Sequence, residues 1–210
     1  MKRWALCIVL LIAAQAMAAP FDVRVFDRDG RPVSGLVTTL NAPGGPATAA
    51  TTAVMDQQDQ RFVPFVLPVR VGTSVRFPNS DSVAHQVYSF SAPKRFELGL
   101  YRGRPHPPVT FEKPGVVILG CNIHDKMIGY VFVTEATYFG KTDAKGVWHI
   151  DSVANNRYEL DVWSPLLARD EPSLKRTVDV GDAPSEIVIR LQKPVQQEPA
   201  PQTDRKVRDY

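Results

Sequence analysis

The sequence predicts an all-β protein built from short strands. Its 210 residues include 18 prolines and 13 glycines, which are scattered as turn signals between short apolar runs. Several of these runs alternate apolar and polar residues with a period of two, the pattern of a half-buried strand. Outside the N-terminal segment, no stretch has the apolar spacing of a helix. The length suffices for one large or two small domains.

Residues 1–18 are predicted to be a signal peptide that is removed from the mature protein. Lys2 and Arg3 form a basic start, an apolar stretch follows, and residues 16–18 (Ala-Met-Ala) fit a cleavage site. The apolar stretch is shorter than the roughly 20 residues that span a bilayer. The leucine before Cys7 is too large for a lipid-attachment box. We therefore expect a periplasmic or secreted protein without a stable membrane anchor.

The mature chain begins with a predicted β-hairpin. Residues 21–27 alternate with a period of two, residues 28–33 carry an Asp-Gly-x-Pro turn, and residues 35–40 return as a second strand. Residues 41–53 are rich in Pro, Gly, Ala and Thr, so we expect a linker without structure of its own.

The central part of the chain, residues 54–134, is also predicted to be strands and turns. Pro64 and Pro68 confine the first of these strands to a sheet edge or a bulge. Residues 95–108 are basic and are expected to form a loop. The predicted strands cover residues 61–71, 73–77, 86–90, 109–113, 116–119 and 128–134.

A third group of strands is predicted between residues 141 and 191. A turn at residues 141–146 leads into a strand that ends at Ile150, and residues 157–163 alternate cleanly. Two further strands cover residues 175–180 and 186–191. Residues 193–210 are rich in Pro, Gln and charge, so we expect a disordered tail.

The charge of the mature chain is close to balanced. The full sequence has 25 basic and 22 acidic residues, and removing Lys2 and Arg3 leaves 23 basic ones. This balance gives no reason to expect binding to nucleic acid or to an anionic membrane.

Cys121, His124 and Met127 stand at a Cys-x2-His-x2-Met spacing. A trigonal site of two imidazoles and a thiolate, with a weak axial thioether, suits copper in both oxidation states. His85 is the candidate for the second imidazole. Because Cys7 belongs to the signal peptide, Cys121 has no partner for a disulfide within the mature chain, and metal binding would explain the lone thiol. The alternative is that Cys121 is a buried apolar residue.

The other histidines do not have this spacing. His106, between prolines, is expected to be a solvated loop residue, and His149 is expected to face solvent on a strand. Met127 could instead be a core-packing residue, but unlike Met55 it has the ligand spacing.

Residues 54–134 resemble a cupredoxin, the family of plastocyanin and amicyanin. The resemblance rests on residues 109–115, the strand into Cys121, the short ligand loop and residues 79–85. The family usually has Asn after the first ligand histidine, whereas this chain has Gln86. The resemblance implies a Greek-key β-sandwich that holds one copper ion. The ligands it implies are His85, Cys121, His124 and Met127.

The remaining strands resemble a carboxypeptidase-regulatory-like sandwich. We expect residues 19–48 to supply its first hairpin and residues 135–192 to supply the remainder, with the cupredoxin unit, residues 49–134, inserted between them. Alternatively, residues 21–40 add strands to the cupredoxin, and residues 135–192 form a separate domain. The whole chain also resembles secreted bacterial proteins often labelled methylamine utilisation protein.

The expected function is single-electron transfer by a type 1 copper ion, with a redox partner protein that the sequence does not identify. A filled ligand set leaves no open coordination position, and no nucleophile–base pair is evident, so we do not expect an enzyme. We expect a monomer. Two alternatives stay open: a copper-binding or copper-trafficking protein without electron transfer, and a β-sandwich interaction module with a degenerate site.

Overall fold

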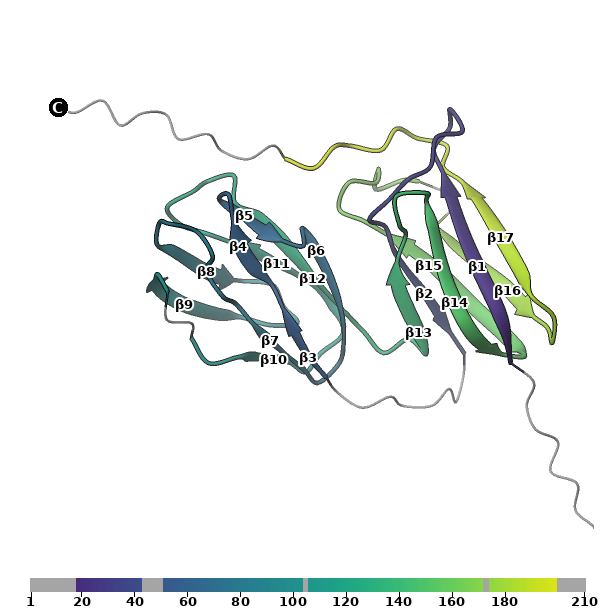
Figure 1. Cartoon of the computed structure of the whole chain (residues 1–210), viewed down its shortest axis with the longest axis horizontal. Helices are drawn as coiled ribbons and strands as arrows, with labels where there is room; N and C mark the ends of the chain where they lie inside the picture. Colours follow the sequence, from purple (N-terminus) through teal and green to yellow (C-terminus); the bar gives the residue numbers. More distant parts are fainter. Residues whose placement is uncertain (1–17, 43–50, 104–105, 172–173, 200–210) are drawn as a thin grey trace, which may run out of the picture.

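The computed structural model describes residues 18–42, 51–103, 106–171 and 174–199. Within these ranges all regular secondary structure is β-strand, which confirms the predicted all-β class. The strands form two β-sandwiches that lie side by side (Figure 1). No helix in the described ranges is long and apolar enough to cross a bilayer. Residues 1–17 of the predicted signal peptide lie outside the described residues.

The first sandwich, called the central sandwich below, is formed by residues 52–134. Its strands in the described ranges are β3 (Thr52–Val54), β4 (Asp56–Gln58), β5 (Arg61–Val63), β6 (Val66–Arg70), β7 (Thr73–Arg76), β8 (His85–Ser89), β9 (Phe96–Tyr101), β10 (Val109–Phe111), β11 (Gly115–Gly120) and β12 (Ile128–Thr134). One sheet has the order β10-β7-β3 and the other β6-β12-β11-β8-β9, while β4 and β5 form a separate hairpin. Pro68 lies in β6 at a sheet edge, as predicted. The single strand predicted over residues 61–71 was wrong, because β5 and β6 are separate strands and Pro64 lies between them.

Strand β11 shows how the side-chain alternation builds the core of the central sandwich. Val117 and Leu119 are fully buried, whereas Ile118 between them is half exposed. Successive side chains of a strand point to opposite faces of the sheet. Cys121, two residues beyond Leu119, is therefore directed into the core, where it is 4% exposed.

The expected loop at residues 95–108 was wrong for its first half, which contains β9. Phe96 and Leu98 pack against the core, and β9 pairs antiparallel with β8. The basic residues and prolines that flank this segment suggested a loop. The apolar side chains and the free edge of β8 determine the observed strand instead.

The second sandwich, called the terminal sandwich below, combines residues from both ends of the chain. Its strands in the described ranges are β1 (Ala18–Phe26), β2 (Val37–Asn41), β13 (Tyr138–Lys141), β14 (Val147–Ala154), β15 (Asn156–Trp163), β16 (Lys175–Val180) and β17 (Ser185–Arg190). The sheets have the orders β14-β1-β17 and β13-β2-β15-β16. The two sandwiches bury separate hydrophobic clusters, so each has its own core.

Strand β1 pairs with the late strands of the chain and not with β11. It runs antiparallel to β14, with Val23 opposite Trp148, and parallel to β17, with Val23 opposite Ile187. This pairing is the one predicted if the central sandwich interrupts the terminal one. The segment that leads into the central sandwich, residues 43–50, lies outside the described residues, and so does most of the predicted linker. The prediction was wrong at both ends of the linker, because Asn41 is the last residue of β2, and Thr52 and Ala53 belong to β3, which pairs with β7.

The turn at residues 28–33 and the turn at residues 141–146 lie next to each other, and the Thr142 hydroxyl donates to the Val33 carbonyl at 2.8 Å. The Val25 N–H donates to the Gly146 carbonyl at 2.8 Å, and the Gly35 N–H donates to the Thr142 carbonyl at 2.8 Å. Gly146 has φ +72°, and a Cβ there would lie 2.5 Å from the Val25 carbonyl oxygen. Only glycine accommodates both the left-handed backbone and this close approach.

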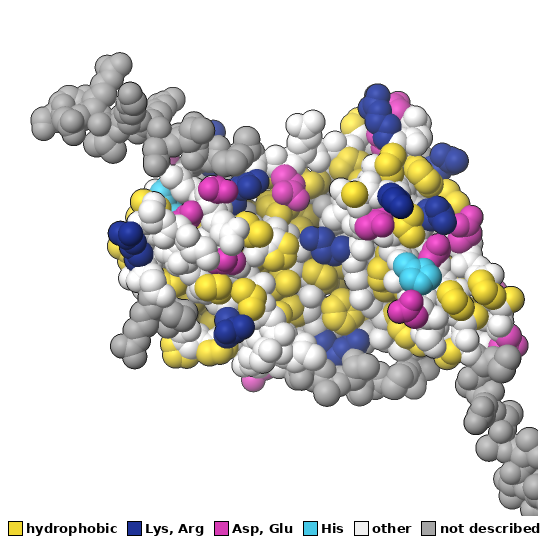
Figure 2. All heavy atoms as spheres, viewed as in Figure 1, with side chains coloured by type: hydrophobic (Ala, Val, Ile, Leu, Met, Phe, Trp, Pro, Cys, Tyr) yellow, Lys and Arg dark blue, Asp and Glu magenta, His cyan; other side chains and the backbone are white. Residues whose placement is uncertain are grey.

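The two sandwiches meet through a small set of side chains from β6, β12, β13 and β15. Arg70 donates to the Ala136 carbonyl at 2.8 Å, and its guanidinium lies 5.0 Å from the centre of the Phe139 ring. The Phe132 and Trp163 rings have their centres 5.1 Å apart. In Figure 2, hydrophobic side chains gather where the sandwiches meet, with basic side chains among them.

The first part of the predicted disordered tail is ordered against the body, which corrects the boundary at residue 193. Val195 packs against the core of the terminal sandwich, and the Gln196 N–H donates to the Leu166 carbonyl at 2.9 Å. The Lys193 N–H donates to the Glu171 carboxylate at 2.9 Å. These long-range contacts compensate for the low apolar content of the segment. Residues 200–210 lie outside the described residues.

Candidate metal centre

Two neighbouring strands bring the predicted ligands to one end of the central sandwich. His85 is the first residue of β8, and Cys121 directly follows β11. These strands are antiparallel, with Gly120 opposite Tyr88, so the start of β8 meets the end of β11. His124 and Met127 lie on the loop between Cys121 and β12.

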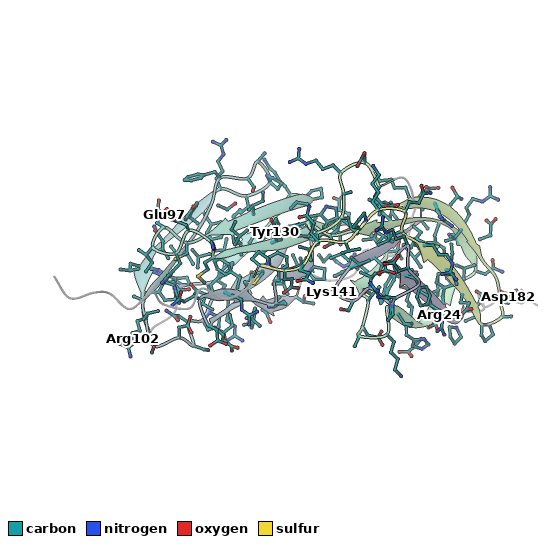
Figure 3. The ribbon with its side chains drawn as sticks, turned by 90° about the horizontal axis from the view of Figure 1, so that it is seen from above. Arg24, Glu97, Arg102, Tyr130, Lys141 and Asp182 are labelled. Carbon is teal, nitrogen blue, oxygen red and sulfur yellow. The ribbon has the colours of Figure 1, made fainter. Side chains whose placement is uncertain are left out.

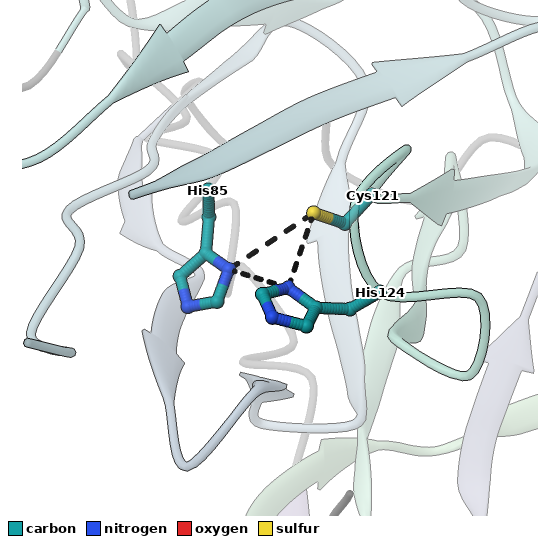
Figure 4. Close-up of side chains that lie close together, drawn as sticks. All are labelled: His85, Cys121 and His124. Atoms are coloured by element: carbon teal, nitrogen blue, oxygen red, sulfur yellow. Dashed lines mark hydrogen bonds between the residues drawn. The ribbon is translucent and has the colours of Figure 1, made fainter. Parts of the chain in front are cut away.

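Three of the four predicted ligands converge in a triangle (Figure 4). The Nδ1 atoms of His85 and His124 are 3.2 Å apart. The Cys121 Sγ atom lies 4.0 Å from Nδ1 of His85 and 3.8 Å from Nδ1 of His124. In a triangle with these edges the equidistant point lies about 2.1 Å from every corner, within the roughly 2.0–2.3 Å of metal–nitrogen and metal–sulfur bonds. The donor set therefore fits one metal ion.

The triangle is mostly shielded from solvent. His85 is fully buried and Cys121 is 4% exposed, whereas His124 is partly exposed. Cys121 is a free thiol and forms no disulfide among the described residues. His124 is thus the donor through which the site comes nearest to the surface.

Asp81 orients the buried imidazole. Its Oδ2 atom lies 2.6 Å from Nε2 of His85. A carboxylate accepts but does not donate, so Nε2 carries a proton, and in the neutral ring Nδ1 is then the atom that can offer a lone pair to a metal. This carboxylate–histidine arrangement is the one that fixes the tautomer and the ring orientation of metal ligands. Sequence reasoning missed Asp81, although its position four residues before His85 was visible.

The Asp81 carboxylate is itself held by the turn between β4 and β5. Burial disfavours its charge, but hydrogen bonds from the Gln60 N–H, from His85 and from the Asp59 N–H together lower the pKa of Asp81. The two backbone donors lie 2.9 Å and 2.7 Å from the carboxylate oxygens. Asp59 and Gln60 have φ values of 51° and 56°, the left-handed backbone of a two-residue hairpin turn. The hairpin and His85 therefore share one carboxylate.

Hydrogen bonds from the partly exposed Asn79 and the buried Tyr101 hold the loop before His85. The Asn79 side chain donates to the carbonyls of Val83 at 3.0 Å and Tyr101 at 2.9 Å. The Tyr101 hydroxyl donates to the Phe77 carbonyl at 2.5 Å, and burial raises the pKa of Tyr101 to about 12. The hydroxyl therefore stays protonated and keeps this bond at any pH at which the protein works.

Gln86 connects the two ligand loops. Asn122 donates from Nδ2 to the Gln86 Oε1 atom at 2.7 Å, and Gln86 donates from Nε2 to Glu97 at 2.6 Å. Gln86 stands where the cupredoxin pattern has Asn, and its longer side chain reaches across to the loop that carries Cys121. Glu97, the third residue of this hydrogen-bond network, lies in β9, the strand that sequence reasoning missed.

Met127 is 1% exposed and belongs to the same buried cluster as Cys121. Its N–H donates to the His124 carbonyl at 2.9 Å, which closes the ligand loop into a turn. Met127 and Cys121 line the same surface cavity of about 500 Å³. The cavity opens among exposed apolar side chains that include Phe90, Ile118 and Ile128. The axial role of the Met127 thioether stays a prediction.

The remaining histidines lie away from the triangle, as expected. His106 faces the Gly99 carbonyl at 3.2 Å. His149 is on the terminal sandwich, where its Nδ1 atom lies 2.5 Å from Asp22. Met55 is buried in the core of the central sandwich.

No protein-family model matches the chain, and no curated protein matches it. Several solved structures are similar to part of it. A Cu-containing nitrite reductase (NirK) from Thermus scotoductus SA-01 is 25% identical, with a TM-score of 0.38, over 53% of this chain and 28% of the reductase. A reduced Cu(I) form of an amicyanin variant is 21% identical, with a TM-score of 0.37, over 46% of this chain and 98% of amicyanin. A pseudoazurin from Sinorhizobium is 22% identical, with a TM-score of 0.32, over 41% of this chain and 76% of the pseudoazurin. All three are cupredoxins, and none of these alignments extends beyond about half of this chain.

Proposed function

We propose that this protein is a type 1 copper protein that carries single electrons between redox partners. The observation that carries the proposal is the triangle of two imidazole nitrogens and one cysteine sulfur with edges of 3.2, 3.8 and 4.0 Å. Such a set, with a thioether nearby, suits both oxidation states of copper. When bound, copper would supply a one-electron couple between Cu(II) and Cu(I).

The chain contributes a fixed set of donors. Cys121 supplies the thiolate, His85 and His124 supply the imidazoles, and Met127 supplies a weak axial contact. The Asp81 hydrogen bond and the Gln86–Asn122 bridge resist movement of these groups. A rigid set that serves both oxidation states keeps the structural change during electron transfer small.

The burial of the donors favours electron transfer over copper delivery. Transfer of copper to another protein requires that the partner's ligands replace those of this protein one by one. Such ligand exchange requires donors that the partner can reach. His85 is fully buried and Cys121 nearly so, which supports a resident ion. The same burial, together with four protein donors, leaves no open position for a substrate, which supports a carrier and not an enzyme.

The apolar surface beside the site is the proposed contact for the partner. Phe90, Ile118, Ile123 and Ile128 are exposed large hydrophobic residues near the ligand loop. Such a patch on a soluble protein marks an interaction surface. The partner is a redox protein with an apolar contact face. The predicted signal peptide supports a periplasmic or secreted location, and we propose that the protein is a monomer.

Spectroscopy of the copper-loaded mature protein tests this proposal. We expect one Cu(II) per chain and a blue colour from thiolate-to-copper charge transfer, with a matching electron paramagnetic resonance signal. Cys121→Ser should abolish the colour, whereas His106→Gln, a histidine outside the triangle, should keep it. A colourless copper complex, or a colour that survives in Cys121→Ser, would refute the type 1 assignment.

A further inference from the structure

A second cavity, of about 260 Å³, lies where the ligand loop of the central sandwich approaches the terminal sandwich. Its lining includes Arg61 from β5, Lys126 from the ligand loop, Lys141 from β13 and Glu198 from the C-terminal segment. Figure 3 shows Lys141 at the junction of the two sandwiches. Figure 1 shows the chain after β17 crossing from the terminal sandwich toward the central one. The cavity therefore brings together four distant parts of the chain.

The charges in this cavity are unequal. The lining residues include three cationic side chains, Arg61, Lys126 and Lys141, and one carboxylate, Glu198. None of the three cations forms an ion pair within 4.0 Å with any residue in the described ranges. Cations that converge in a cleft attract an anion, because low-dielectric walls focus their field.

Two of the cations are only partly satisfied. The Arg61 Nε atom is buried and has no hydrogen-bond partner among the described residues. The Lys141 ammonium donates to the Val66 carbonyl at 3.0 Å. Burial lowers the pKa of Lys141 below its ordinary value, although Glu198 acts in the opposite direction. Buried donors without partners are costly, so an acceptor in the cavity would remove an existing penalty.

The walls and the size of the cavity select a small ligand. Phe62 and Phe65 contribute apolar surface beside the cations. The volume lies below the roughly 300–1,000 Å³ typical of sites for drug-sized molecules. Guanidinium and ammonium groups bind carboxylate and phosphate oxygens through charge-assisted hydrogen bonds.

We propose that this cavity is a binding site for a small oxyanion of the carboxylate or phosphate class. Arg61, Lys126 and Lys141 bind the anion, and Glu198 competes with it as a carboxylate attached to the same chain. Residues 192–199 are anchored on the terminal sandwich, so Glu198 stays near the cavity at a high effective concentration.

The position of the site connects it with the metal centre. Lys126 and Ile128, which line the cavity, are the two neighbours of Met127. An anion bound to Lys126 restrains the loop that carries the thioether. This coupling rests on the proposed copper function, whereas anion binding does not.

Calorimetric titration of the metal-free mature protein with inorganic phosphate, and separately with acetate, tests the site at constant ionic strength set with chloride. We expect binding that weakens at least tenfold in Arg61→Gln and in Lys126→Gln and tightens in Glu198→Gln. Lys113→Gln, which removes an exposed lysine on the β10–β11 turn, is the control and should bind like the wild type. Circular dichroism identifies any variant that has not folded, and the exposed Lys126 is the position whose replacement disturbs the fold least.

Equal binding by Lys126→Gln and Lys113→Gln would refute the site, and so would the absence of phosphate and acetate binding by both the wild type and Glu198→Gln. Binding of phosphate but not acetate, or the reverse, identifies which oxyanion the cavity takes. Cys121→Ser should bind the anion like the wild type. Failure of the copper proposal and failure of the anion site are therefore distinguishable.

Discussion

Replacing Asp81 by Ala tests whether the carboxylate below His85 controls the metal centre. Asp81 accepts a hydrogen bond from His85 at 2.6 Å and one each from the Asp59 and Gln60 N–H groups. The substitution removes all three hydrogen bonds that Asp81 accepts, but it leaves the four proposed ligands themselves unchanged. His85 then loses the group that selects its tautomer, and the hairpin turn loses the acceptors for its two left-handed residues.

The size of the effect follows from these contacts. Loss of an outer-shell partner of a ligating histidine typically reduces metal affinity 10–100-fold, which is about 1.4–2.7 kcal/mol. Losing the hydrogen bonds to the turn, which is exposed at Asp59 and partly buried at Gln60, should also destabilise the metal-free protein by about 0.5–1.5 kcal/mol. Asp81→Asn retains one carbonyl oxygen, so it can accept only part of the three hydrogen bonds. We expect its affinity to lie between those of the wild type and Asp81→Ala.

Competition titration with a copper chelator measures the affinity, and urea unfolding of the metal-free protein measures the stability. Asp125→Ala is the matched control, because it removes an exposed acidic charge on the ligand loop without a contact to His85. We expect that control to stay within a factor of about three of the wild type, since exposed charges interact weakly. Equal losses in Asp81→Ala and Asp125→Ala would show that net charge, and not orientation of His85, sets the affinity.

Three further outcomes are expected. Met127→Leu should retain copper and raise the reduction potential measured by voltammetry, because losing a weak thioether donor disfavours Cu(II) more than Cu(I); loss of copper would contradict the axial role. Gly129→Ala should lower the free energy of unfolding by about 1–3 kcal/mol, because the new Cβ would lie 2.6 Å from the Cβ atom of Phe62 in β5. Gly99→Ala is the control, because a Cβ at that position would have no atom within 4 Å. The hydrogen bond to Asp22 raises the pKa of His149, so its stabilising effect should be present below about pH 6.5 and lost as the pH rises through the folded-state value. Thermal midpoints of the wild type and His149→Gln should therefore differ more at pH 5.5 than at pH 8.5, and a difference that is constant with pH would contradict this assignment.

Local chemistry made much of this protein predictable from its sequence. The alternation in residues 21–27 and 157–163 and the Asp-Gly and Pro-Gly turns depend on near neighbours only, and β1 and β15 are observed at those two alternating stretches. The Cys-x2-His-x2-Met spacing is also local, because a short loop holds those side chains together wherever the loop is placed. His85 was identified by its chemistry, as the donor that the motif lacks.

Tertiary structure decided the features that depend on strand pairing. The long-range register places β1 between β14 and β17, makes residues 96–101 a strand and orders residues 193–199. Two sites combine groups that are far apart in the sequence. One is the hydrogen-bond network of His85, Asp81 and the β4–β5 turn, and the other is the cationic cavity at Lys141. Side-chain spacing determines which face of a strand a residue occupies, but only the packing of separate strands determines which residue it meets there.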